Sequence, residues 1–140
     1  MNCGMSNYLQ EQLLNGVLMN TAYTFPTEVK LALFSTFIQP QDAIGDPTEL
    51  SGDGYARTTV SFGAWADGFS VNDADCAFPI ATADWDAVIG WAIIFQASGS
   101  PSGDDKILFF RNGCPKVVVD GETYTLEAGE IRIAVNPCGC

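Results

Sequence analysis

The sequence contains no histidine among its 140 residues. Histidine is the usual acid–base group near neutral pH and the commonest metal ligand in proteins, so its absence excludes Ser-His-Asp and Cys-His catalysis. The phosphate-binding P-loop, the dinucleotide-binding glycine pattern and the nucleophile elbow are missing as well. We therefore expect a protein that is not an enzyme and that uses no metal ion and no organic cofactor.

Basic residues are scarce, with six Lys and Arg against seventeen Asp and Glu and a net charge of -11. Proteins that hold nucleic acid need basic faces to neutralise phosphates, so we expect no nucleic-acid partner. Charged residues of both signs make up only 16% of the chain. A free surface is expected to carry about 25–35% charged residues, so this deficit predicts that a protein partner covers part of the surface.

Long apolar runs are missing too. No stretch approaches the roughly 20 apolar residues that span a bilayer. The first ten residues, MNCGMSNYLQ, lack the basic start and apolar centre of a secretory signal. We expect a soluble protein with no membrane partner and no export signal.

The length fits a single domain over residues 1–140. We divide it into an N-terminal helix at 6–20, a β module at 27–136 and a cysteine-containing tail at 137–140. Ser6 is a suitable N-cap for the helix. The apolar residues that follow recur at the spacing of one helical face, and they are Leu9, Leu13, Leu14, Val17 and Leu18.

The centre of the predicted core is Ala81–Gln96, ATADWDAVIGWAIIFQ, which holds two of the three tryptophans. From Val88 to Phe95 every residue is apolar or glycine. A run of this length and composition predicts a strand that is covered on both faces.

Further β-like segments alternate with turn signals along the rest of the chain. They are Val29–Phe37, Arg57–Phe62, Lys106–Arg111, Lys116–Val119, Glu122–Leu126 and Ile131–Val135. No crossover helices separate them, as a parallel sheet would require. The expected fold is mainly β, an antiparallel β-sandwich or barrel of about seven to eight strands with one N-terminal α-helix.

Paired aspartates are the only residues that suggest catalysis or calcium binding. The pairs are Asp73 with Asp75, Asp84 with Asp86, and Asp104 with Asp105. Such pairs could flank a glycosidic bond or bind calcium. Each pair lies in a turn-rich stretch, where aspartate is favoured for local backbone hydrogen bonds, and we interpret them as turn carboxylates.

The five cysteines are Cys3, Cys76, Cys114, Cys138 and Cys140. Three interpretations compete: a zinc site, disulfides, and free buried thiols. The C-x-C spacing at the end of the chain does not match common structural zinc sites. Cys76 lies beside Phe78 and is interpreted as a buried thiol. We hypothesise that at least one of Cys3, Cys138 and Cys140 forms a disulfide, with Cys114 as a further candidate partner, because chain ends are rarely buried.

Two motifs, SGDGYAR at Ser51–Arg57 and FPIATADW at Phe78–Trp85, stand in a fixed order behind the helix segment SNYLQEQLLNGVL. With the strands that follow, the chain resembles a family of small bacteriophage virion proteins that are often labelled tail fibre proteins. The resemblance implies a non-enzymatic structural subunit of the virion, present in symmetric copies. The NPCGC end departs from the family pattern, so the resemblance implies nothing about cross-linking.

Three functions follow from this resemblance and from the composition. The first is a capsid decoration or cement protein, which would bind the major capsid protein and stabilise the assembled head by linkage. The alternative is a tail or tail-fibre component that contacts other tail proteins or the host, although the chain has no repeats or heptads. A carbohydrate-binding or glycosidase-like module is a distant third.

Partner contact is expected through the helix, at Leu9 and Leu13, and through the SGDGYAR motif, at Tyr55 and Arg57. The loop Gln39–Tyr55 is a further candidate, and a homo-oligomer is expected. For Arg57 an internal salt bridge is favoured over direct partner contact, because the chain has few cations and many carboxylates.

Overall fold

The computed structural model describes residues 3–135, and within them the chain forms one helix and nine strands. The elements in chain order are β1 (Cys3–Met5), α1 (Asn7–Met19), β2 (Val29–Phe34), β3 (Thr58–Val60), β4 (Ser70–Val71), β5 (Cys76–Ala77), β6 (Val88–Phe95), β7 (Lys106–Lys116), β8 (Thr125–Leu126) and β9 (Arg132–Ile133).

Five strands form one antiparallel sheet in the order β1-β7-β6-β2-β3. Two small sheets, β4-β9 and β5-β8, have two strands each. The predicted class, mainly β and antiparallel with an N-terminal helix, is confirmed. The large sheet stays open with β1 and β3 at its edges, so the barrel alternative is wrong. Both edge strands have only three residues, which limits the unpaired backbone at each edge.

β6 is the middle of the fold, as its apolar run predicts. It pairs with β2 on one side and with β7 on the other, and its residues 90–94 are all buried. One face carries Trp91 and Ile93 into a large core, and the other carries Ala92 and Ile94 into a smaller one. Both faces of the strand are therefore covered.

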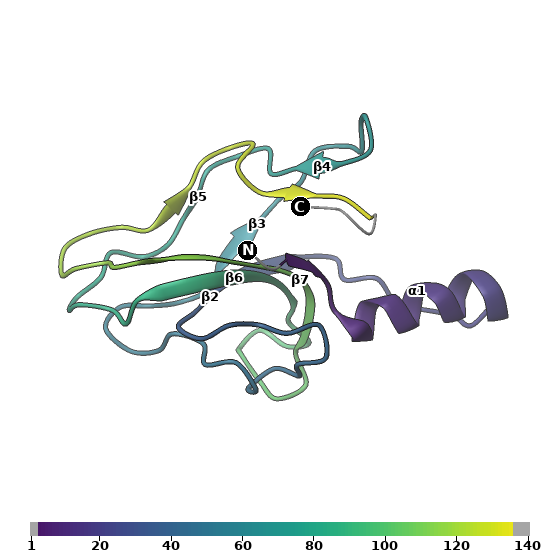
Figure 1. Cartoon of the computed structure of the whole chain (residues 1–140), viewed down its shortest axis with the longest axis horizontal. Helices are drawn as coiled ribbons and strands as arrows, with labels where there is room; N and C mark the ends of the chain where they lie inside the picture. The colour runs from purple at the N-terminus through teal and green to yellow at the C-terminus, as the bar shows by residue number, and fades with distance from the viewer. Residues whose placement is uncertain (1–2, 136–140) are drawn as a thin grey trace.

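Different segments cover the two faces of the large sheet (Figure 1). Phe78, Tyr124 and Ile131, which lie next to the small sheets, pack into the larger core. On the opposite face Ile38 and Ile44, from the connection between β2 and β3, pack against the smaller core. The connection is therefore a layer of the fold and not merely an exposed loop.

The helix α1 begins at its predicted N-cap, Ser6. The Ser6 hydroxyl accepts a hydrogen bond from the Leu9 amide at 3.2 Å, and it also donates to the Ile107 carbonyl. Asn20 ends the helix in the left-handed conformation, with φ 53°. The N-cap thus anchors the start of the helix to β7.

The short strands were harder to predict. β1, β4 and β5 were not expected, and β3, β8 and β9 are shorter than their predicted segments. Residues 117–119 were predicted as part of a strand, but β7 ends at Lys116. Strands of two or three residues show no alternating pattern of their own, and they exist here because partners distant in sequence pair with them.

Candidate functional site

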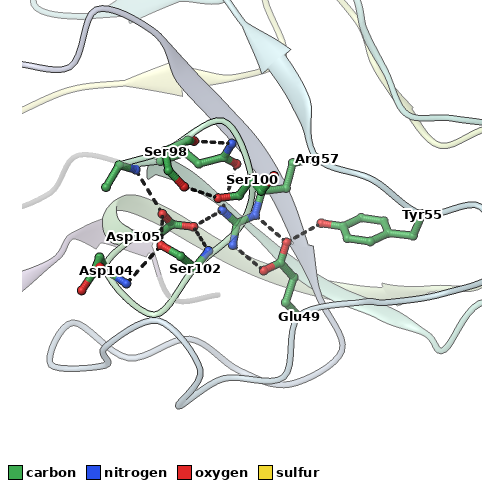
Figure 2. A network of polar contacts seen from close by, with 10 residues as sticks. Glu49, Tyr55, Arg57, Ser98, Ser100, Ser102, Asp104 and Asp105 are labelled. Carbon is green, nitrogen blue, oxygen red and sulfur yellow. Dashed lines mark hydrogen bonds and ion pairs between the residues drawn. The ribbon is translucent and has the colours of Figure 1, made fainter.

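Arg57 lies just before β3 at the centre of a polar cluster (Figure 2). Its guanidinium donates two parallel hydrogen bonds to the Glu49 carboxylate, Nε to Oε1 and Nη2 to Oε2, each at 2.7 Å. The third guanidinium nitrogen, Nη1, donates to Oδ2 of Asp105 at 2.6 Å. The side chains of Arg57 and Asp105 are 4% and 0% exposed. The structure therefore places Arg57 in an internal salt bridge, as its sequence context favoured.

Asp105 closes the turn between β6 and β7 while it pairs with Arg57. Its carboxylate accepts hydrogen bonds from the Ala97 amide at 3.1 Å and from the Ser102 amide at 2.9 Å. Burial raises the pKa of Asp105, but the hydrogen bonds from Ser102, Arg57 and Ala97, together with the Arg57 charge, lower that pKa by more. The carboxylate is therefore held ionised inside the protein.

Tyr55 extends the cluster into the larger core. Its hydroxyl donates to Glu49 at 2.9 Å and accepts from the Leu33 amide at 3.0 Å. Burial and the Glu49 charge raise the pKa of this phenol. The hydroxyl stays protonated and links β2 to the residues that hold Arg57.

The two motifs that carry the family resemblance pack against each other. The Asp53 carbonyl accepts hydrogen bonds from the Thr82 amide and from the Trp85 indole, both at 2.9 Å. The Tyr55 ring stacks on Phe78 and meets the edge of Trp85, with centroid distances of 6.0 and 5.6 Å. Both motifs therefore build the core of the β module.

The conformation of Gly54, the second glycine of SGDGYAR, explains why the motif needs a glycine at this position. Its φ is 82°, a left-handed conformation that favours glycine, and a Cβ at this position would lie 2.6 Å from the Ile80 carbonyl oxygen. The glycine permits the close approach of the two motifs.

Aspartates of the predicted pairs hold turns together. Asp84 accepts a hydrogen bond from the Asp120 amide at 2.9 Å, and Asp75 accepts one from the Ala128 amide at 2.8 Å. Asp73 accepts one from the Ser61 hydroxyl. Within residues 3–135 no group of three or more His, Cys, Asp or Glu is placed to hold a metal ion.

Asp84 and Asp86 also line a hollow of about 120 Å³ beside Trp85. Ligand pockets usually have volumes of about 300–1,000 Å³, so this hollow is small for a sugar.

The cysteines divide into two groups. Cys76 is buried and Cys114 is exposed, and both carry free thiols. The candidate role of Cys114 in a disulfide within the chain is therefore not fulfilled, because its side chain faces solvent at the end of β7 with its thiol unpaired. Cys138 and Cys140 lie outside the described residues, and the disulfide hypothesis for Cys3, Cys138 and Cys140 stays a prediction.

The second half of α1 projects away from the sheets (Figure 1). Its exposed apolar side chains, which we call the helix tip, are Leu14, Val17, Leu18 and Met19, with exposures of 57, 81, 75 and 71%. Charged side chains are absent from residues 12–27, which include the helix tip and the chain that follows it. The helix tip is therefore an uncharged apolar surface on a strongly acidic protein.

The expected partner-contact residues lie elsewhere. Leu9 is buried in the larger core, Leu13 and Tyr55 are half-buried against it, and Arg57 is occupied by its salt bridges. Burial within this chain disfavours partner contact through Leu9 and Arg57. The exposed positions that we did not single out include Met19, Phe25 and Trp65. The apolar spacing is the same in the first and the second half of α1, so it could not tell the buried half from the exposed half.

Comparison with known proteins adds one family. The family model described as Podophage GP4 fiber I protein gp80 matches residues 4–134, a range that includes α1 and both motifs. No curated protein matches the chain. In the described part of the chain no helix combines the length and apolarity that a membrane crossing requires.

Proposed function

Because the match spans nearly its whole length, the chain belongs to the family of the podophage GP4 fiber I protein gp80, and we propose that it is a tail or tail-fibre component of a phage particle. The family is one of small phage virion structural proteins, so the protein belongs in the virion. The family description carries the proposal.

This proposal replaces the capsid decoration function that the composition favoured. Low charge density, small size and terminal cysteines suit any subunit that packs against neighbours, so they do not distinguish a head protein from a tail protein. The fibre description of the family is the more specific observation, and it favours the tail. Binding to the major capsid protein is the competing outcome of the test below.

The same proposal includes a role without catalysis. Of the aspartates that suggested a glycosidase, Asp75 and Asp84 accept backbone hydrogen bonds at turns, and Asp105 pairs with Arg57. The two family motifs build the core, and the Arg57 cluster ties the β2–β3 connection to the β6–β7 turn. Such a rigid body would hold surfaces for contact with other phage structural proteins in a constant geometry, which lowers the entropy cost of assembly.

The copy number in purified virions tests the proposal. Quantitative mass spectrometry would measure this protein relative to the major capsid protein, and gold-labelled antibodies would locate it by electron microscopy. We expect a handful to a few dozen copies per particle, with label at the tail. Hundreds of copies, with label over the head, would overturn the tail assignment and support a decoration protein.

A further inference from the structure

We propose that the helix tip of one chain docks against the helix tip of a second copy of the same chain. The inference goes beyond the proposed function, because self-association of the helix does not depend on where in the virion the protein lies. It rests on three properties of α1: the exposed apolar stripe of its second half, its marginal stability and the lack of charge at the helix tip.

The apolar stripe of α1 is packed at one end and bare at the other. Leu9 is 6% exposed in the larger core, whereas Leu14, Val17 and Leu18 follow at helical i, i+3, i+4 spacing and are mostly exposed. Side chains at this spacing lie on one face of a helix, where they form the ridge that packs into another helix. The bare half thus has the shape and chemistry of a helix-packing surface.

Apart from the C-cap at Asn20, the bare half has little local stabilisation. The helix has 13 residues, with no acidic residue in its first turn and no basic residue in its last. Gly16 lowers helix stability by about 1 kcal/mol relative to alanine. Helices of this length are marginal in water unless they pack against something, so a partner surface would stabilise the last two turns.

The charge distribution favours a second copy as the partner. Two chains with a net charge of -11 repel each other, and a contact surface that carries no charge adds nothing to that repulsion. Residues 12–27 form such an uncharged segment, and they include the whole helix tip. A basic partner would instead be attracted to the acidic faces of the protein. An apolar helix ridge is complementary to its own copy in a symmetric contact.

A charge placed in the helix tip tests the proposal. In Val17→Glu a carboxylate replaces an 81% exposed side chain, so the monomer fold is retained, which circular dichroism would verify. Val117→Glu makes the same change at a 61% exposed site after β7 and is the matched control. Sedimentation equilibrium of the full chain over about 1–100 µM would measure self-association. We expect wild type and Val117→Glu to associate equally, and Val17→Glu to associate at least about tenfold more weakly.

Three outcomes would overturn the proposal. The first is a wild-type chain that stays monomeric across the series, and the second is association that Val17→Glu leaves unchanged. The third is a monomeric wild-type chain that binds another purified virion protein only while Val17 is intact, because the helix tip would then serve a different partner. None of these outcomes bears on copy number in the virion, so the tail assignment can fail or hold separately.

Salt dependence supplies a readout that needs no substitution. Raising the salt concentration from about 0.05 M to about 0.5 M screens the repulsion between two acidic chains, so self-association through the helix tip is expected to strengthen. Weakening by salt would point to a contact between opposite charges and would overturn the proposal.

Discussion

Arg57 and Asp105 form an ion pair with an Nη1–Oδ2 distance of 2.6 Å, although neither side chain is more than 4% exposed. Their positions are 48 residues apart in the chain, and Arg57 also binds Glu49. A buried charge without its partner is costly, because the remaining charge has lost its water. This pair therefore makes the turn before β7 and the start of β3 depend on each other.

Asp105→Asn is expected to lower the free energy of unfolding by about 3 kcal/mol, because it keeps the side-chain size but leaves the third nitrogen of Arg57 without a charged partner. Asp104→Asn is the matched control, since Asp104 is the exposed neighbour outside the ion pair. Urea denaturation of the wild type and of the two variants measures the effect. Equal losses in the two variants would contradict a stabilising role for the pair.

The stability of the wild type is expected to fall in acid because of the same carboxylate. The pKa of Asp105 is lowered in the folded state from its ordinary value of 3.8, so the unfolded chain binds more protons between the two pKa values. The contribution of Asp105 to the free energy of unfolding is complete above a pH of about 4, and it is lost as the pH falls through the folded-state pKa. Urea denaturation of wild type and Asp105→Asn should be measured from roughly pH 3 to pH 7, a range that brackets the ordinary pKa of an aspartate. The free energies of unfolding of the two proteins should converge as the pH falls. A constant difference between the two would contradict the assignment.

The elements that could be predicted from the sequence are those with strong local patterns. The apolar run Val88–Phe95 became β6 with the same bounds, and Ser6 became the N-cap of α1. Eight consecutive apolar or glycine residues leave few alternatives to a buried strand, and a hydroxyl before an amphipathic segment satisfies a free backbone amide.

The candidate site was less predictable because it depends on contacts between distant segments. Nothing near Arg57 in the sequence identifies Asp105 as its partner, since carboxylates outnumber cations by seventeen to six. Likewise, Leu9 and Leu18 belong to one helical stripe, yet the first is 6% and the second 75% exposed. The packing of β7 against the helix decides which residues of the apolar stripe are buried. The helical pattern in the sequence does not decide it.

Gly90→Ala is expected to destabilise the protein by about 2 kcal/mol or more, because overpacking a filled site forces the backbone to move. A Cβ at Gly90 would lie 2.6 Å from the Arg111 carbonyl oxygen, where β6 and β7 change register. Gly113→Ala, at a position on the neighbouring strand with open space around it, is the control. Thermal unfolding of both variants would measure the difference, and a Gly90→Ala variant as stable as Gly113→Ala would contradict this account.

Asn112 should be hard to replace, because its amide makes a reciprocal pair of hydrogen bonds with the backbone of Ile38. Its Nδ2 donates to the Ile38 carbonyl at 2.8 Å, and its Oδ1 accepts from the Ile38 amide at 2.9 Å. Asn112→Asp keeps the acceptor but sets a carboxylate oxygen against that carbonyl in a buried site, at an expected cost of about 2 kcal/mol or more.

The deficit of Asn112→Asp should shrink in acid. The new carboxyl can donate to the Ile38 carbonyl only when it is protonated, so burial and this hydrogen bond raise its folded-state pKa. Its stabilising contribution is then present at low pH and is lost as the pH rises through that pKa. Denaturant midpoints of Asn112→Asp and Asn112→Ala at several pH values would check this, because the alanine variant has no group to titrate there. Parallel pH profiles for the two variants would contradict it.

Thiol labelling separates the cysteines by their surroundings. Burial is the main reason that the pKa of the Cys76 thiol is raised, so this thiol is both shielded and protonated, whereas Cys114 is exposed. A maleimide reagent is expected to modify Cys114 rapidly in the folded protein and Cys76 only after unfolding, with peptide mass spectrometry to identify each site. Fast labelling of Cys76 in the folded protein would instead mean that the contacts between β5 and β8 open readily, because Cys76 pairs there with Leu126.

The same reagent tests the disulfide hypothesis. If one of Cys3, Cys138 and Cys140 is paired as hypothesised, labelling after unfolding without a reducing agent should modify fewer than the five cysteines of the chain. Five labelled cysteines would refute the disulfide.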